Sequence, residues 1–392
     1  MRLKHGLKDA PLLGVCAFAL AACSGGGSGN GVTTTTTAVY STTILVSDGA
    51  SGISAAHQDA NLVNPWGIAF EPTGPVWIAN NGTQTSTLYD GNGAAQALTV
   101  TFPQGQGPDG KGADADPTGV VLYTGNTDFV ISNAAGSGSA EFIYDGEGGT
   151  LSGWSPRTGN ATVIMYDDGA GGAVYKGLAL ATSSSGNRLY AADLHNNKVD
   201  VFDASFAKVT PAGTFKDPTL PAGYAPFNLA LLGGKLYVAF AQQLAPDNHD
   251  NANGAGLGLV DVFDLDGNFL QHLIPTGGAL NAPWGMVLAP SDFGAFSGDL
   301  LVGNFGDGRI NAYDAGTGAF IGALSDSTGA AIAFPGLWGL AFGNDADNQP
   351  HNTLFFSAGI NGEADGLYGR IDTRTVTTTG SSSGGTCTGY GC

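Results

Sequence analysis

Six short apolar segments of this sequence start with nearly the same residues, and each carries one side chain at an equivalent position. Four of these side chains are aromatic, and one is the amine of a lysine. Aromatic rings can stack on a sugar or another flat ligand, with the lysine as the only charge in the set. The six residues, about 51 to 58 positions apart, are Trp66, Thr118, Lys176, Phe227, Trp284 and Trp338.

A repeat of this length is typical of propeller blades. In a closed ring the first, fifth and sixth blades are neighbours, so Trp66, Trp284 and Trp338 should form one continuous arc with Lys176 opposite. We therefore predict a ligand-binding site at the mouth of the central channel, formed by these four residues and Phe227. In the alternative interpretation, the aromatic rings pack against the next blade and belong to the core.

A second set of equivalent positions lies at the end of the second strand of each repeat, and its members are Asn80, Asn133, Asp193, Gln242, Asn304 and Ala358. Amide and carboxylate oxygens that converge on an axis could hold Ca²⁺ or another divalent cation. The chain resembles, at the level of the fold, the gluconolactonase-type propellers that bind a divalent metal near this place. The candidate metal ligands are Asn80, Asn133, Asp193 and Asn304. In the alternative, these side chains cap turns by bonding to their own backbone.

The sequence lacks the common catalytic motifs. Its one Gly-x-Ser-x-Gly match, Gly380 to Gly384, has no strand before it and no helix after it, which a nucleophile elbow requires. His195, two residues after Asp193, is the one histidine that could act as a base or ligand near the second set. We favour a non-enzymatic protein that binds a ligand or a protein partner. The alternative is a metal-dependent hydrolase or lyase of the lactonase type.

The elements that would position these residues follow a regular order. Each opening strand is followed by a second apolar strand, such as residues 76–80, 129–133 or 300–304, and by a third strand that ends in an aromatic residue and aspartate. Gly-rich turns then lead to a fourth strand. The sixth unit lacks its fourth strand, while residues 42–48 form an unpaired strand before the first unit. The prediction is an all-β, six-bladed β-propeller over residues 40–374, closed by this N-terminal strand in the last blade.

Both ends of the chain differ in composition from the repeats. Residues 1–22 have a basic head and a short apolar run, which indicates a signal peptide, and Leu20-Ala21-Ala22-Cys23 resembles the lipobox of bacterial lipoproteins. We expect export, lipidation at Cys23 and anchoring at the cell envelope, in the outer membrane. Residues 23–39 are interpreted as a Gly/Ser/Thr-rich tether. Residues 375–392 are interpreted as a low-complexity tail in which Cys387 and Cys392 could form a local disulfide.

Composition narrows the choice of partners. The chain has 392 residues, 64 of them glycine, and a net charge of −19 with only 12% charged residues. Such an acidic surface repels nucleic acids and anionic lipids, so we expect no nucleic-acid partner and membrane contact only through the lipid anchor. We expect a monomer whose ligand the sequence does not name.

The third unit, residues 186–203, closely resembles an NHL repeat. With Leu62-Val63-Asn64-Pro65-Trp66-Gly67 and Ala282-Pro283-Trp284-Gly285, the whole chain resembles an uncharacterised family of exported bacterial NHL-like propellers. Some members of that family carry a PEP-CTERM anchoring tail, and this sequence departs from that pattern, with Cys387 and Cys392 in its tail and a lipobox in front instead. The resemblance implies the propeller fold and carries over no activity.

Overall fold

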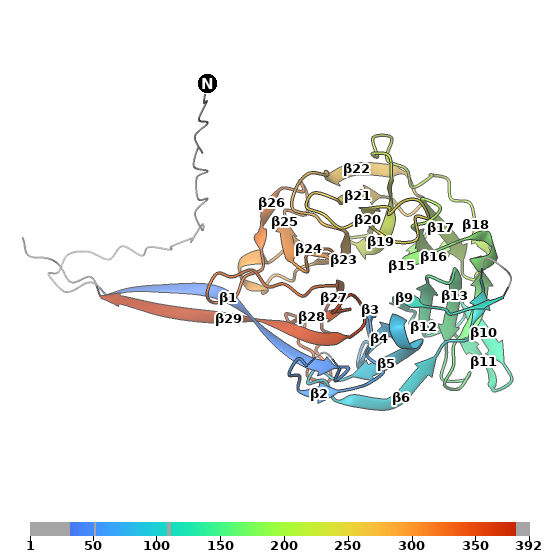
Figure 1. The fold of residues 1–392 in the computed structure, drawn as a ribbon, viewed down its shortest axis with the longest axis horizontal. Coiled ribbons are helices and arrows are strands. Elements are labelled where there is room, and N and C mark those ends of the chain that lie inside the picture. The colour runs from blue at the N-terminus through green and yellow to red at the C-terminus, as the bar shows by residue number, and fades with distance from the viewer. Residues whose placement is uncertain (1–31, 51, 108–110, 382–392) are drawn as a thin grey trace, which may run out of the picture.

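The computed structural model describes residues 32–50, 52–107 and 111–381, which form a six-bladed β-propeller (Figure 1). The first strand of each repeat is the innermost strand of its blade, and the innermost strands of neighbouring blades contact one another around the ring, including those of the sixth and first blades. The predicted all-β, six-bladed fold is confirmed.

Blades 1 and 3 to 5 follow the predicted strand order. Blade 1 contains β3 (Pro65–Phe70), β4 (Val76–Asn80), β5 (Thr85–Tyr89) and β6 (Ala95–Thr101). Blade 3 contains β15 (Tyr175–Ser183), β16 (Gly186–Asp193), β17 (Lys198–Asp203) and β18 (Lys208–Val209). Blade 4 contains β19 (Tyr224–Leu232), β20 (Lys235–Gln242), β21 (Leu259–Phe263) and β22 (Phe269–Ile274). Blade 5 contains β23 (Pro283–Leu288), β24 (Leu300–Asn304), β25 (Ile310–Tyr313) and β26 (Phe320–Ala323).

Blade 2 departs from the predicted order. Its strands are β9 (Pro117–Leu122), β12 (Phe142–Gly146), β13 (Thr150–Trp154) and β14 (Val163–Asp167). The segment predicted as its second strand forms β10 (Val130–Asn133), which pairs with β11 (Gly136–Ser139) in a separate hairpin. A central blade strand is covered on both faces, and β12 is buried throughout, whereas Val130 in β10 is 51% exposed. The assignment of residues 129–133 to the blade was therefore wrong.

Blade 6 joins the two ends of the described chain. Its strands are β27 (Leu337–Phe342), β28 (Leu354–Ala358), β29 (Leu367–Ser381) and β1 (Val32–Ser47), with the short β2 (His57–Gln58) at the edge. β1 and β29 pair in antiparallel register from Val32↔Ser381 to Ser47↔Leu367, and Figure 1 shows their far ends projecting from the propeller as a ribbon.

The ribbon differs from the expected tether and tail. Residues 32–39 and 375–381 lie in paired strands, which suits a segment rich in β-branched threonine and valine. The predicted signal peptide, Cys23 and the Cys387–Cys392 pair lie outside the described residues, as do Ser382, Ser383 and Gly384 of the Gly-x-Ser-x-Gly match.

Little other regular structure is present in the described ranges. A small hairpin joins β7 (Gly105–Gln106) and β8 (Gly112–Ala113). Three single turns of 3-10 helix lie at Asn81–Thr83, Gly169–Gly171 and Gly294–Phe296. Within these same ranges, no helix has the length and apolar character needed to span a bilayer.

The glycine that follows the aromatic anchor explains why the opening segments are so alike. A Cβ atom at Gly67 would lie 2.6 Å from the Thr118 carbonyl oxygen, and one at Gly339 would lie 2.5 Å from that of Trp66. At these two positions the innermost strands of adjacent blades approach too closely for any larger residue, whereas blade 4 has Asn228 at the equivalent position. The second contact joins blade 6 to blade 1.

Candidate binding site at the channel mouth

The aromatic anchors meet on the propeller axis and plug the channel. Trp66 stacks on Trp338 with ring centroids 3.4 Å apart, and Trp284 meets both rings edge-on at 5.9 and 5.8 Å. Phe227 lies against Trp338 at 5.8 Å. The exposed fractions of Trp66, Trp284 and Trp338 are 1%, 4% and 1%, and Phe227 is fully buried. This corrects the expectation of an open stacking surface, because the rings pack on one another and are almost completely buried.

The plug separates two cavities of different chemistry. One, of about 310 Å³, is lined mostly by glycines and aliphatic residues that follow the anchors, together with Asn228 and Trp284, and by no ionisable side chain. The other, of about 620 Å³, lies at the end where the innermost strands begin. Its floor contains Trp66, Trp338 and Phe305. Of these two cavities, only the second is lined by ionisable side chains, and we call it the acidic mouth.

Lys176 sits at the side of the acidic mouth with its ammonium group fully paired. The lysine is buried, and its Nζ forms ion pairs with Glu147 and, at 3.2 Å, with Asp250. The same atom lies 5.5 Å from the centre of the Trp66 ring, within cation–π range. Burial lowers the pKa of Lys176, but the charges of Glu147 and Asp250 outweigh burial and raise the pKa above its usual value. The lysine therefore remains charged.

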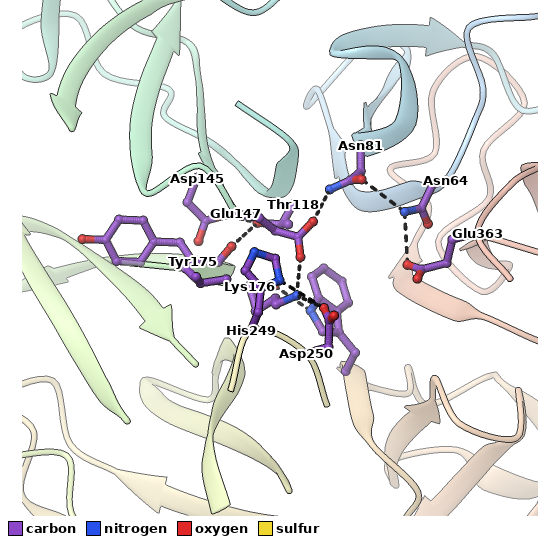
Figure 2. Close-up of polar contacts among 12 residues, drawn as sticks. Asn64, Asn81, Thr118, Asp145, Glu147, Tyr175, Lys176, His249, Asp250 and Glu363 are labelled. Carbon is purple, nitrogen blue, oxygen red and sulfur yellow. Dashed lines mark hydrogen bonds and ion pairs between the residues drawn. The ribbon is translucent and has the colours of Figure 1, made fainter. Parts of the chain in front are cut away.

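A row of hydrogen bonds links the carboxylate of blade 2 to that of blade 6 (Figure 2). Asn81 Nδ2 donates to Glu147 Oε2 at 2.8 Å, and Asn64 Nδ2 donates to Asn81 Oδ1 at 3.2 Å and to Glu363 Oε1 at 3.1 Å. Asn64 Oδ1 in turn accepts the indole N–H of Trp338 at 3.1 Å. Burial, reinforced by the charge of Glu147, raises the pKa of Glu363. The plug and the rim of the mouth thus form one polar network.

His249 and Asp250 reach the mouth from the long connection between β20 and β21. His249 Nδ1 lies 3.3 Å from Asp250 Oδ1. The hydrogen bond from His249, together with the charge of Lys176, holds the pKa of Asp250 well below its usual range, and the same hydrogen bond raises the pKa of His249. Ligand atoms of Glu147, His249 and Asp250 lie within 4.8 Å of one another. A metal ion there would have to displace Lys176, which already bonds both carboxylates.

The four predicted metal ligands do not converge. Asn80 donates to Thr85 and Thr87 of the neighbouring strand, and Asn304 donates to the Ala279 carbonyl and to Asp307. Asp193 accepts from the backbone of Val174 and from Asn196 and pairs with Lys198, while Asn133 lies in the separate β10–β11 hairpin. His195 contacts the Asp247 carbonyl. These side chains stabilise turns and strand ends, so the alternative interpretation fits them better.

Sequence reasoning identified Trp66, Lys176 and Trp338 but missed the carboxylates of the mouth, because Glu147, Asp250, Asp307 and Glu363 lie in loops outside the repeated strands. One signal was available. The sequence has only four glutamates, and two of them, Glu147 and Glu363, line this one cavity. A rare residue type that gathers at one place in a fold is better evidence for a site than a position that every repeat shares.

Fold and site together define a class of protein, a six-bladed propeller whose channel is plugged by indoles and opens into one acidic mouth. No family model matches the sequence. An uncharacterised protein of Acanthamoeba polyphaga mimivirus, R648, is 35% identical over 332 residues, which cover 81% of this chain and 76% of that protein. A second, L690, is 31% identical over 345 residues, covering 85% and 86%. The chain belongs to the same family as these two viral proteins.

Among solved structures, a streptogramin B lyase covers 86% of this chain and 98% of its own, with a TM-score of 0.47 and 12% identity. A PQQ-bound aldose sugar dehydrogenase from Streptomyces coelicolor gives the same coverage and identity, with a TM-score of 0.46. R648 and L690 are viral proteins, whereas the sequence resembles an exported bacterial family, so a bacterial origin remains a prediction.

Proposed function

We propose that this protein binds a small organic cation, such as an amine, in the acidic mouth. The observation that carries this proposal is the charge of the cavity. Four carboxylates line it, those of Glu147, Asp250, Asp307 and Glu363. The basic side chains of the cavity are Lys176, which pairs with Glu147 and Asp250, and His249, which also pairs with Asp250. Carboxylates beside aromatic rings suit an ammonium group, and Lys176 occupies just such a position between Glu147, Asp250 and Trp66.

The size of the cavity and the freedom of its rim also support this ligand class. A volume of about 620 Å³ falls within the usual range for small-molecule sites. Glu363 and Asp307 have no basic partner among the described residues, so they are available to a second cation. Because much of the attraction is between charges, the affinity should fall as salt is added.

Calorimetric titration with putrescine, spermidine and arginine at low and high salt tests the proposal. Glu363→Gln keeps the shape of the side chain and removes its charge, so it should weaken amine binding about tenfold, which corresponds to the loss of one charge-assisted contact. Glu141→Gln is the matched control, since Glu141 lies at the opposite end of β12 from the mouth. Equal binding by both variants, or no binding by the wild type, would refute the proposal.

We further propose that the chain is exported and anchored through a lipid on Cys23. The support is the basic and apolar composition of residues 1–22 followed by Leu20-Ala21-Ala22-Cys23. Labelling cells with a palmitate analogue should tag the wild type and not Cys23→Ser, and fractionation should move the variant out of the outer membrane. A labelled Cys23→Ser protein would contradict this assignment.

A further inference from the structure

Two neighbouring blades carry the same five residues on their third strands. The sequence Val-Asp-Val-Phe-Asp occurs at residues 199–203 in blade 3 and at 260–264 in blade 4. The aspartate at its second position, Asp200 or Asp261, is buried in both blades. Because alternate residues of a strand share a face, Asp261 lies between Leu259 and Phe263, which pack into the core between blades 3 and 4. A carboxylate at such a position must be protonated, satisfied by hydrogen-bond donors or paired with a cation.

In blade 3 the partner is supplied by lysine. Asp200 Oδ2 lies 2.7 Å from Lys208 Nζ and 3.1 Å from Lys198 Nζ. It also accepts a hydrogen bond from the Tyr175 hydroxyl at 2.9 Å. The buried charge of Asp200 is therefore balanced within the chain.

In blade 4 the equivalent carboxylate, Asp261, has no lysine beside it among the described residues. The cross-strand partner of Asp261 is His272, whose Nδ1 lies 2.7 Å from Asp261 Oδ1 and 3.1 Å from Oδ2 of a second buried carboxylate, Asp217. Within the described residues, no lysine or arginine forms an ion pair with either aspartate. Two buried carboxylates thus share one imidazole nitrogen, where blade 3 places two ammonium groups on one carboxylate.

The hydrogen bonding of the cluster is also incomplete. Asp261 is 0% exposed, and its Oδ2 has no hydrogen-bond partner. One Nδ1–H can serve two acceptors only as a fork, and it leaves this oxygen without a donor. An unpartnered buried carboxylate oxygen beside a second carboxylate is costly, which indicates that a cation belongs there.

We propose that Asp217, Asp261 and His272 bind a divalent transition-metal ion, with Zn²⁺ as the best match. Their ligand atoms lie within 4.8 Å of one another. Ligands about 2.1 Å from a common Zn²⁺ lie about 3.0 to 3.4 Å apart at octahedral to tetrahedral angles, close to the spacings of 2.7 and 3.1 Å to His272. An imidazole with carboxylates favours Zn²⁺ over Ca²⁺ or Mg²⁺, which prefer oxygen ligands alone.

The surroundings suit a structural ion. Thr219 donates through its backbone N–H and its hydroxyl to Asp217 at 2.7 Å, which orients that carboxylate as outer hydrogen bonds do in metal sites. The side chain of His272 is 32% exposed, so an ion can enter from solvent. Binding would fasten the segment between β18 and β19, which carries Asp217, to the outer strands of blade 4.

Calorimetric titration of tag-free, EDTA-treated protein with Zn²⁺ tests the site. The wild type should bind one ion with a Kd on the order of micromolar or tighter, with a rise in melting temperature. His272→Gln should weaken binding at least about 100-fold, because the only nitrogen ligand is lost. His351→Gln is the matched control, since His351 also lies between two aspartates, Asp292 and Asp345, but on the exposed surface.

Two further variants separate loss of the Zn²⁺ site from loss of folding and from binding at the acidic mouth. His272→Lys offers Asp261 an ammonium group, as Lys208 does for Asp200, and should fold normally while losing the Zn²⁺ site. His249→Gln alters the cluster at the acidic mouth and should leave Zn²⁺ binding unchanged. The proposal is overturned if the wild type binds no Zn²⁺ stoichiometrically, if His272→Gln binds as the wild type does, or if His249→Gln is the variant that loses the ion.

Discussion

The indole of Trp66 lies face to face with that of Trp338, with the ring planes 16° from parallel, although the two residues come from the first and last blades. The neighbouring backbone is equally close, since Gly339 leaves no room for a side chain against the Trp66 carbonyl. This stack joins the two ends of the repeat array at the axis. It also explains why three of the six anchors are tryptophans, because large rings fill a channel that smaller side chains would leave hollow.

Trp338→Ala should destabilise the protein by about 3 to 5 kcal/mol, the usual cost of removing a large buried aromatic side chain. Urea unfolding followed by far-UV circular dichroism would measure the change. Phe320→Ala is a suitable comparison because Phe320 is 53% exposed, and it should alter stability by less than about 0.5 kcal/mol. If both variants lose the same free energy of unfolding, the axial stack contributes no more to stability than an exposed aromatic side chain does.

Lys176→Met should destabilise the fold by leaving Glu147 and Asp250 without their cation. Breaking a fully buried ion pair costs about 3 to 5 kcal/mol, and we expect the lower end of this range because the side chain of Asp250 is 62% exposed. Adding Glu147→Gln to Lys176→Met should restore part of the stability. If the double variant is less stable than Lys176→Met, the ion pair is not the reason for the loss.

Asp145 should make stability depend on pH. It is buried, accepts from the Thr118 hydroxyl at 2.9 Å and from the Gly119 N–H at 2.7 Å, and has an unpartnered Oδ2. Burial raises the pKa of Asp145 to about 7. Between about pH 4 and pH 7 the folded state therefore binds more protons than the unfolded state at this group, so its contribution to stability falls as the pH rises.

Asp145→Asn removes that titration. As the pH rises from 5 to 8, the wild type should lose stability at this group and the variant should not. The unfolding free energy of the variant should therefore rise relative to that of the wild type by a few kcal/mol in order of magnitude. Urea unfolding at both pH values would measure it, and taking the difference cancels groups common to both proteins. A difference that stays constant with pH would mean that Asp145 is ionised throughout this range.

Tyr40 should fasten the N-terminal strand to the ring. Its hydroxyl donates to the Phe293 carbonyl at 2.9 Å, and its ring lies 5.0 and 5.9 Å from those of Phe293 and Phe296 in blade 5. Tyr40→Ala should lower stability by about 3 kcal/mol or more through lost packing, whereas deletion of residues 1–38 should leave the melting temperature nearly unchanged. If the deletion lowers stability more than Tyr40→Ala does, the projecting ribbon, and not the docked part of β1, stabilises the protein.

Local pattern was sufficient for most of the fold. The period of the anchors, the Trp-Gly pairs and the aromatic-aspartate strand ends each depend on neighbours within one blade or the next, and these residues identified six blades. Blade 2 shows the limit of this reasoning. Residues 129–133 and 142–146 are both short apolar runs, and only their burial in the assembled sheet distinguishes the strand of the blade from the outer hairpin.

The sequence alone determined a repeat of apolar strands, the chemistry of its anchors and the acidic character of the chain. Tertiary structure decided what those residues do, because exposure and proximity depend on packing between distant segments. It turned the indole arc into a plug and dispersed the predicted metal ligands. It also brought Glu147, Asp250 and Glu363 from separate loops into one cavity. Loops of unrelated sequence meet only once the ring has formed, so the repeat pattern placed a site at the channel mouth but did not identify its carboxylates.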